Sequence, residues 1–459
     1  MSSASAQPTS ADLERAEIIV AGYPIAGSSA WLPHGFELCD RVLDRFSAAF
    51  EDAGFEELAM PSLVAETTFD QQAEAIKDFR RRLYMGEHPD GTGWHVIAPT
   101  IEAQISTVFA RWLADGDPLP LRIICVRTVG RHETGGLRPL WKDRLVWPFF
   151  EAQVALHGDV GPEIDRLVRM PRAVCAGLGL PTLAIERLSA AALSSSYADR
   201  RLELVTVLPG GELTMLTSVY DLGSRFSDAF AVGAGDEPLT MLNFAFSGRL
   251  LLALVQHSWA ADGPVYQPAL SPVQVAVLPS RSTSAERLAA VHEAAGAAGI
   301  RAATMTGRNL AARRQRAADL GCPVVLHLDE STGKDLWTER FTQASHHVDQ
   351  HPAAFSAMRA DLDRLDERMR AERADRPTGW TVRCTDLTEV AATVGSGVLA
   401  AVPLCGHGSC PISVADDAGV DLIGRLYPET AGGSGGVCLA CGAANPDTIL
   451  FGRKIKGEK

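Results

Sequence analysis

The chain has 459 residues, 46% of them hydrophobic and 22% charged, and a formal net charge of −13 at pH 7. This length exceeds what one compact core needs, so two or three domains are expected, and the composition is that of an ordinary globular protein. The negative charge disfavours a protein that coats nucleic acid with its whole surface, although a local basic face is compatible with it. Because the sequence shows neither a signal peptide nor an apolar run of roughly 18 residues, we expect a cytoplasmic protein without a membrane segment.

The first 270 residues predict helices and one long β-hairpin. Residues 1–10 are small and polar and are expected to be disordered. Apolar residues at helical spacing predict helices in residues 35–54 and 100–115. Two β-rich runs, "LRIICVRTVGRHE" and "RLVWPFFEAQVALHG", then flank a loop that contains Gly135 and Gly136. They predict an antiparallel hairpin with a long connection.

The pattern changes after residue 270. Strands and helices alternate over residues 271–376, which predicts a small α/β domain with a largely parallel sheet. Residues 377–459 show little regular periodicity and hold a cluster of cysteines. We therefore expect three domains, over residues 11–270, 271–376 and 377–459.

The hairpin carries charges where a sheet should be apolar. Arg131 and Glu133 are two residues apart, so on a strand both side chains point to one face. A guanidinium group can hold a phosphate or carboxylate through two hydrogen bonds, and a carboxylate can accept from an amino group. Together with Glu151 and Gln153 on the second strand, they predict a polar ligand site. A solvated, salt-bridged hairpin is the alternative.

Four of the nine cysteines are arranged in two short pairs near the C-terminus. Cys405 and Cys410 are separated by four residues, and Cys438 and Cys441 by two. Four thiolates in two such pairs suit tetrahedral structural zinc, which leaves no open position for catalysis. Free thiols are the alternative, and His407 could replace one of the cysteines.

The hairpin resembles motif 2 of class II aminoacyl-tRNA synthetases, in the form found in archaeal and eukaryotic-type prolyl-tRNA synthetases. The family pattern aligns from Glu133 to Ala152 without a gap. "APTIEAQ" is similar to the family's "RPTSE" helix, "LTSVYDLGSRFSDAF" to "ATVHNLGTNFAKTF", and "FSGRLLLALVQH" to motif 3. The resemblance covers nearly the whole chain and implies an α+β fold: a class II antiparallel-sheet catalytic domain, an α/β anticodon-binding-like domain and a small C-terminal zinc domain. It also implies a homodimer, with an interface at helix 35–54 and Pro61.

The resemblance further implies roles for individual residues. Arg131 would hold the α-phosphate and the substrate carboxylate, and Arg249 the outer phosphates, so both would serve catalysis; Glu133 would accept from the adenine amino group. Thr100 and Glu102 would receive the substrate amine. The implied ATP-binding residues are Arg131, Glu133, Arg144, Ser218 and Arg249. The implied substrate-binding residues are Thr100, Glu102, Arg131, Glu151, Gln153, Asn243 and Ala245. The implied cofactors are ATP, Mg²⁺ and a structural Zn²⁺ held by Cys405, Cys410, Cys438 and Cys441.

The sequence departs from the family pattern in the amino-acid pocket and in part of the ATP-site rim. The substituted positions are Gln153 for His, Asn243 for Cys or Thr, Ala245 for Gly, Met215 for Gln, Tyr220 for His and Leu145 for Glu. We expect ATP-dependent amino-acid activation with an altered pocket, in a role open to specialised metabolism. An authentic prolyl-tRNA synthetase and a non-catalytic tRNA- or partner-binding protein are the alternatives. The sequence leaves the amino acid and its acceptor open, with tRNA as one candidate.

Two further clusters have ordinary explanations as well as functional ones. The basic helix in "GRNLAARRQRAADLG" could contact tRNA phosphates or form a solvated face. It carries Arg308, Arg313, Arg314 and Arg316. A metal site on a helix at His346, His347 and His351 is the weaker interpretation, since such runs are typically polar surface.

Overall fold

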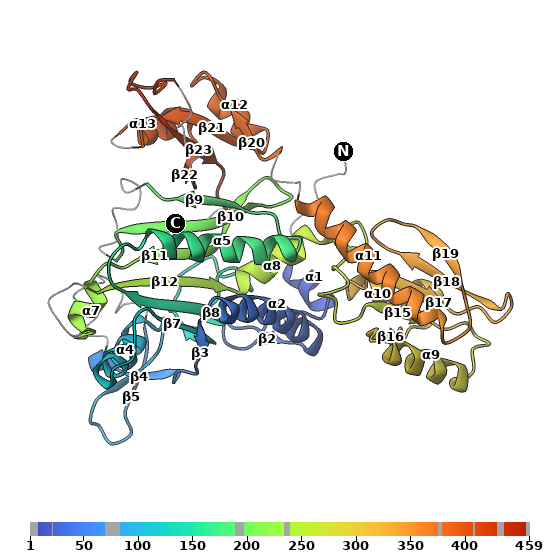
Figure 1. The fold of residues 1–459 in the computed structure, drawn as a ribbon. Coiled ribbons are helices and arrows are strands. Elements are labelled where there is room, and N and C mark those ends of the chain that lie inside the picture. The colour runs from blue at the N-terminus through green and yellow to red at the C-terminus, as the bar shows by residue number, and fades with distance from the viewer. Residues whose placement is uncertain are drawn as a thin grey trace.

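The structure is a computed structural model. It describes residues 8–20, 22–68, 83–188, 197–233, 239–374, 379–406, 409–428 and 436–455. They form a central unit around a large sheet, an α/β unit at the right in Figure 1 and a C-terminal unit at the top. Helix α1 (Ser10–Arg15) begins within the segment expected to be disordered and is capped by Thr9, so that expectation does not hold for its last residues.

The sheet of the central unit has eleven strands in the order β20-β21-β23-β22-β9-β10-β11-β12-β8-β7-β3. Its neighbours are antiparallel except at the two edge pairs, β20 with β21 and β3 with β7. The strands within the first 270 residues are β3 (Glu56–Glu57), β7 (Leu121–Gly130), β8 (Leu145–Leu156), β9 (Leu183–Glu186), β10 (Arg200–Val207), β11 (Leu213–Asp221) and β12 (Thr240–Ser247). The predicted hairpin is confirmed as β7 and β8, and the mixed fold with an antiparallel sheet agrees with the predicted class.

The two faces of this sheet differ in chemistry because successive side chains alternate between them. On β8, Phe150, Ala152 and Val154 belong to the core cluster that α2 shares, whereas Glu151 and Gln153 point to the opposite face. The predicted stripe of the first long helix, from Leu38 to Phe50, lies in that same core. The helices of the unit are α2 (Pro33–Asp52), α4 (Glu102–Asp115), α5 (Gly161–Gly177), α7 (Arg225–Ala229) and α8 (Gly248–His257). Core packing on one face leaves the other face to hold polar residues.

Three small sheets border the central unit and the junction to the α/β unit. They pair β1 with β2, β13 with β14, and β6 with both β4 and β5. Their strands are β1 (Ile19–Val20), β2 (Ala30–Trp31), β4 (Leu63–Ala65), β5 (Tyr84–Glu87), β6 (Trp94–Ile97), β13 (Trp259–Ala260) and β14 (Gly263–Pro264).

The α/β unit contains a five-stranded sheet in the order β16-β15-β17-β18-β19. Only β16, β15 and β17 are parallel, so the expected largely parallel sheet is instead mixed. His346 and His347 lie on β19, not on a helix. The elements are β15 (Val275–Leu278), α9 (Ala285–Ala297), β16 (Ala302–Thr304), α10 (Leu310–Asp319), β17 (Val324–His327), β18 (Lys334–Glu339), β19 (Ser345–Asp349) and α11 (Ala354–Ala374).

The C-terminal unit is more regular than its sequence suggests. Its strand β22 pairs with β9 through Arg425 and Leu426, so this unit extends the large sheet. Its core joins Cys384, Val402 and Phe451. The elements are β20 (Thr381–Arg383), α12 (Glu389–Gly395), β21 (Leu399–Leu404), α13 (Cys410–Ala418), β22 (Asp421–Leu426) and β23 (Asp447–Gly452).

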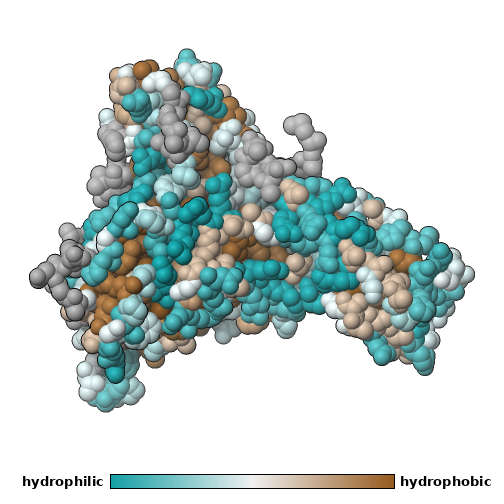
Figure 2. All heavy atoms as spheres, in the orientation of Figure 1, coloured by the Kyte–Doolittle hydropathy of each residue, from teal (hydrophilic) through white to brown (hydrophobic). Residues whose placement is uncertain are grey.

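The surface of the molecule is mixed in character. On the face in Figure 2, polar residues cover most of the area, and hydrophobic residues reach it in separate patches on all three units. Within the ranges that the structure describes, no helix combines the length and apolar character that crossing a membrane requires.

Candidate active site

A cavity of about 390 Å³ opens on the polar face of the large sheet. Its walls come from the β7–β8 hairpin, strands β10 to β12, the start of α8 and the segment before α4. The predicted site residues that line it are Thr100, Glu102, Arg131, Glu133, Glu151, Ser218, Asn243, Ala245 and Arg249. Side chains that are far apart in the sequence therefore share one cavity.

Arg131 and Glu133 reach the cavity from a turn. Strand β7 ends at Gly130, and the Glu133 backbone N–H donates to the Arg131 carbonyl over 2.7 Å. The expectation that both residues lie on the strand is therefore wrong, although both face the cavity. Arg131 is fixed by an Nε–H hydrogen bond to the Pro99 carbonyl (2.9 Å), and its Cζ lies 4.7 Å from the centre of the Phe149 ring. Stacking and hydrogen bonding hold this cation in place for a ligand.

Arg249 lies in the first turn of α8 on the opposite side of the hairpin. Ser247 caps this helix by accepting a hydrogen bond from the Arg249 backbone N–H. The guanidinium Nη2 donates to the Trp141 carbonyl over 3.0 Å, and Cζ lies 5.0 Å from the centre of the Trp141 ring. Because a helix N-terminus carries partial positive charge, α8 adds to the attraction of this arginine for anions.

Arg144 is not among the residues that line the cavity. Its Nε donates to the Glu133 carbonyl over 3.0 Å, and its backbone N–H donates to the Gly27 carbonyl over 2.6 Å. Gly27 has φ +79°, and a Cβ built on it would lie 2.9 Å from Arg144 Cγ, so the close approach requires glycine. In this structure Arg144 holds the loop that carries Glu133, which differs from the predicted direct contact with ATP.

Two buried carboxylates meet at the other end of the cavity. Thr100 Oγ1 is within hydrogen-bonding distance of both Glu102 and Glu151, at 2.7 Å from Glu151 Oε1, and Tyr197 donates its phenolic proton to Glu102. Burial raises the pKa of Glu151, and the neighbouring charge of Glu102 raises it further. A positively charged amine at this position would relieve the repulsion between the two carboxylates.

Asn243 and Ala245 follow the two carboxylates along the floor, whereas Gln153, on the same face of the sheet, lies outside the cavity. Asn243 Nδ2 is 3.5 Å from Glu151 Oε1, and Asn243 pairs with Gln153 across the strands. Gln153 is completely buried and is not among the residues that line the cavity, which corrects the predicted direct contact with substrate. Neither amide atom of Gln153 has a hydrogen-bond partner among the residues that the structure describes.

Arg127 adds a buried positive charge on the same face of the sheet, where it pairs across the strands with Phe149. Its Nη1 donates to Gln104 Oε1 over 2.8 Å, and the residue is 6% exposed. Burial lowers the pKa of Arg127, and the nearby Glu151 and Glu102 partly counter this effect. Charged and amide groups are therefore buried next to the cavity residues on the same face of the sheet.

Several cavity residues were not assigned from the sequence. Trp141, Lys142 and Asp143 of the hairpin loop line the cavity, and so do Tyr197 and Arg201. Burial raises the pKa of Asp143 to about 7. The period of two could have indicated Arg201 as it did the hairpin residues, since Arg201 and Glu203 are two residues apart and share one face of β10. Trp141, Lys142 and Asp143 lie in a loop, so no strand periodicity in the sequence indicated them.

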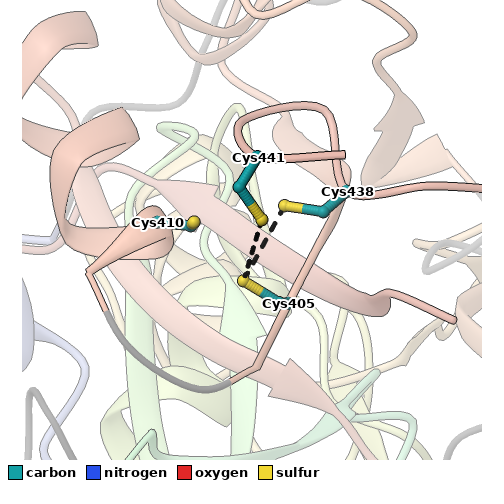
Figure 3. Close-up of side chains that lie close together, drawn as sticks. All are labelled: Cys405, Cys410, Cys438 and Cys441. Carbon is teal, nitrogen blue, oxygen red and sulfur yellow. Dashed lines mark hydrogen bonds between the residues drawn. The ribbon is translucent and has the colours of Figure 1, made fainter. Parts of the chain in front are cut away.

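The four clustered cysteines converge in the C-terminal unit (Figure 3). All four Sγ atoms lie within 4.8 Å of one another, and Cys405 Sγ is 3.8 Å from both Cys438 Sγ and Cys441 Sγ. Tetrahedral zinc with Zn–S bonds of about 2.3 Å separates its sulfurs by roughly 3.8 Å. The donor set and its spacing therefore fit zinc. His407 lies outside the described residues.

Known proteins with similar sequences are proline–tRNA ligases of archaea. The chain is 26% identical to that of Methanopyrus kandleri over 438 residues, which covers 91% of this chain and 89% of the relative. It is 26% identical to that of Thermococcus kodakarensis over 466 residues, which covers 96% of each chain. No family model matches the chain.

Solved structures with the same fold are prolyl-tRNA synthetases. The Giardia lamblia enzyme in complex with prolyl-adenylate superposes with a TM-score of 0.86 at 18% identity and covers 97% of both chains. The Cryptosporidium parvum enzyme in complex with L-proline and AMP superposes with a TM-score of 0.83 at 15% identity, over 97% of this chain and 96% of that one. These likenesses confirm the predicted resemblance and fold.

Proposed function

We propose that this chain, a homologue of the archaeal proline–tRNA ligases with the fold of class II prolyl-tRNA synthetases, activates an amino acid as its adenylate. The observation that carries the proposal is the charge arrangement of one cavity. Arg131 and Arg249 stand at one end, and Thr100, Glu102 and Glu151 stand at the other. Cations suit the phosphates of ATP, and buried carboxylates suit the amine of an amino acid.

This arrangement supports attack of the amino-acid carboxylate on the α-phosphorus of ATP. A new C–O–P bond forms, the bond to the β-phosphate breaks, and pyrophosphate leaves. Such a step needs positioned positive charge more than a proton donor or acceptor. In our proposal Arg131 steadies the carboxylate and α-phosphate, and Arg249 steadies the departing phosphates. Bound magnesium would add to the charge neutralisation by these two arginines.

We further propose that the pocket selects a polar amino acid and disfavours proline. Asn243 lies on the cavity floor and Gln153 lies directly beside it, with its amide buried and without a partner among the described residues. The Asn243 amide can donate to and accept from a polar group on the substrate, whereas a plain proline ring offers it no hydrogen bond. Pockets that hydrogen-bond a substrate group discriminate strongly against analogues without that group.

An authentic prolyl-tRNA synthetase is the second candidate, because the relatives carry that name over nearly the whole chain. Amino-acid-dependent exchange of labelled pyrophosphate into ATP separates the candidates. We expect exchange to depend on a polar amino acid and to be weak with proline. Exchange that is highest with proline across a broad panel would favour the second candidate. Absence of exchange with every amino acid would favour a binding protein without catalysis.

We propose that the cysteine cluster binds one structural zinc ion, which would cross-link β21, α13 and the turn at Cys438 and Cys441. Elemental analysis of the purified protein should give one zinc per chain, and Cys438→Ser should lose it. Cys384→Ser is the matched control, because Cys384 shares the same core but lies outside the cluster. Zinc that persists in Cys438→Ser would contradict the assignment.

We propose tRNA as the acceptor of the activated amino acid and a homodimer as the working form. Of the arginines expected to face tRNA, Arg316 pairs with Glu17 and Arg313 donates to the Pro279 carbonyl. Arg308 and Arg314 are therefore the better candidates for phosphate contact. Aminoacylation of total tRNA, compared between wild type and Arg314→Ala, tests the acceptor, and sedimentation tests the dimer.

A further inference from the structure

The two carboxyl groups at the amino-acid end of the cavity meet at one hydroxyl group. Thr100 Oγ1 is within hydrogen-bonding distance of Glu102 Oε2 and lies 2.7 Å from Glu151 Oε1. Both glutamates are 1% exposed, and Thr100 is 7% exposed. Glu102 begins helix α4, whereas Glu151 lies within strand β8. The folded chain therefore brings two buried carboxyl groups against a single hydroxyl.

The number of protons at this point follows from the hydrogen-bonding capacity of each group. A threonine hydroxyl donates one proton and accepts through its lone pairs, whereas an ionised carboxylate only accepts. If both carboxyls were ionised, the Thr100 proton could serve only one of the two contacts, and the other contact would bring two acceptors together. One further proton makes one carboxyl a donor to Thr100 Oγ1, so that both contacts become hydrogen bonds. Neighbouring buried carboxyl groups share a proton in the same way at other sites.

Glu151 is the better placed of the two carboxyls to carry this proton. Glu102 lies in the first turn of α4, where the helix favours negative charge, and its Oε1 accepts the phenolic proton of Tyr197. Glu151 Oε2 has no hydrogen-bond partner among the described residues, and Glu151 Oε1 lies 3.5 Å from Asn243 Nδ2. Burial, followed by the charge of Glu102, raises the pKa of Glu151 to about 8. Without substrate, Glu102 is therefore the ionised member of the pair and Glu151 the neutral acid.

The other charged and titratable groups that act on Glu151 come from β7 and from the segments after β7 and before β10. Arg131 and Arg127 lower the pKa of Glu151, but burial and the neighbouring carboxylate outweigh them. Burial raises the pKa of the Cys125 thiol and raises the pKa of the Tyr197 phenol, so both groups stay neutral near pH 7. The proton that can leave this site near neutral pH is therefore the one shared by the two carboxyls.

Resting on the proposed adenylation activity, we propose that Glu151 releases this proton when the substrate amine binds, so that the site exchanges one proton for one ammonium group. Without substrate, Glu102 is a carboxylate and Glu151 a neutral acid. In the complex both are carboxylates that accept from the ammonium group, and the proton passes to the solvent. The site carries one negative charge in both states, because the ammonium charge replaces the proton that leaves. Glu151 thereby makes the site specific for a positively charged amine.

Calorimetry and kinetics both test the exchange. The probe is whichever of L-proline, L-serine, L-asparagine and L-glutamine supports the fastest pyrophosphate exchange, because none of their side chains titrates between about pH 6 and pH 8. Calorimetric titration at about pH 6.5, in buffers with different enthalpies of ionisation, should show the release of about one proton per amino acid bound. At saturating ATP, the KM for the amino acid should fall about tenfold from pH 6 to pH 7 and level off above about pH 8, since binding requires the ionised form of Glu151.

Glu151→Gln should abolish both effects. The glutamine amide can donate to Thr100 Oγ1 as the neutral acid does, but it has no proton to release. Proton release should fall to near zero, and the KM should no longer decrease between pH 6 and pH 7. Asp143→Asn is the matched control and should keep the proton release, because Asp143 also lines the cavity but lies in the hairpin loop, where it accepts from the Leu140 backbone N–H. Binding without proton release in wild type, a KM that is independent of pH, or equal loss of proton release in Asp143→Asn would overturn the proposal.

Infrared spectroscopy of the protein without substrate separates this proposal from the adenylation activity. At about pH 6.5 wild type should show the C=O band of a buried carboxylic acid, which disappears as the pH rises well above 8 and is missing from Glu151→Gln. Carboxyl-labelled glutamate should shift this band in wild type, which assigns it to a glutamate and keeps the test valid if the variant does not fold. If no amino acid supports exchange, the proposed adenylation is overturned, and the band still decides whether the two carboxyls share a proton. Absence of the band, or a band that labelled glutamate does not shift, would overturn the shared proton.

Discussion

The two ends of the cavity carry opposite charges and hold them in different ways. At the ATP end, Arg131 and Arg249 stack on aromatic rings and bond to backbone carbonyls. At the amino-acid end, the carboxylates of Glu102 and Glu151 share Thr100 and repel each other. The protein itself therefore holds the two arginines through hydrogen bonds and ring contacts. At the other end, the repulsion between the two carboxylates can be relieved by a positively charged ligand group.

The difference extends to the resemblance with prolyl-tRNA synthetases. The arginines implied for phosphate binding match the family pattern. The departures lie in the amino-acid pocket and in part of the ATP-site rim. Activation of any amino acid needs the same phosphate contacts, but each amino acid needs its own pocket. Under the proposed function, this fold keeps its reaction while its substrate changes.

Removing the cation at the ATP end should have the largest effect. Arg131→Ala should lower pyrophosphate exchange about a hundredfold, since loss of one positioned phosphate contact costs roughly 3 kcal/mol. The fold should persist, because Arg131 packs mainly on Phe149. Arg111→Ala on the surface of α4, where Arg111 pairs with Asp115, is the control and should change nothing. Activity within a few-fold of wild type in Arg131→Ala would refute its assignment.

Glu102→Gln should separate the two ends kinetically. We expect kcat/KM for the amino acid to fall about 30-fold, because a charged hydrogen bond to the substrate amine is lost. The KM for ATP should stay within about twofold, since Glu102 belongs to the other end. A comparable increase in both KM values would show that the ends are not independent.

Gln153→Met should raise stability. The buried amide of Gln153 has no partner among the described residues, so an apolar side chain of similar length should raise the free energy of unfolding by about 1–2 kcal/mol. Gln104→Met is the matched control and should destabilise, since Gln104 donates to Pro61 and accepts from Arg127. Chemical denaturation measures both. Destabilisation by Gln153→Met would mean that water or substrate-side groups satisfy the amide.

The smallest effect concerns pH at the ATP end. Burial raises the pKa of Asp143 from its ordinary value to about 7, so the carboxyl is mostly neutral below pH 7 and ionised above it. Ionisation adds negative charge beside the proposed phosphate site, so the KM for ATP should increase a few-fold between about pH 6 and pH 8. Asp143→Asn should flatten this dependence. The raised pKa also means that the Asp143 contribution to stability declines as pH rises from about 4 to 7.

The sequence predicted the site better than it predicted the contacts within it. The period of two placed Glu151 and Gln153 on one face, but only the structure shows that the cavity ends before Gln153. Arg144 was assigned to ATP from the family resemblance. Its contact with Gly27 is not visible to local patterns, because Gly27 is distant in the sequence. The cysteine spacing predicted a cluster that the structure forms. The extension of the large sheet by β22 depends on pairing with β9, more than 200 residues away, which no local pattern encodes.

Direct detection of the adenylate tests the account most directly. The protein would be incubated with ATP, magnesium and an equimolar mixture of proteinogenic and non-proteinogenic amino acids, and the bound adenylates identified by mass spectrometry. Our account predicts that the adenylate of an amino acid with a polar side chain predominates and that prolyl-adenylate is a minor species. Predominance of prolyl-adenylate, or the absence of any adenylate, would contradict it.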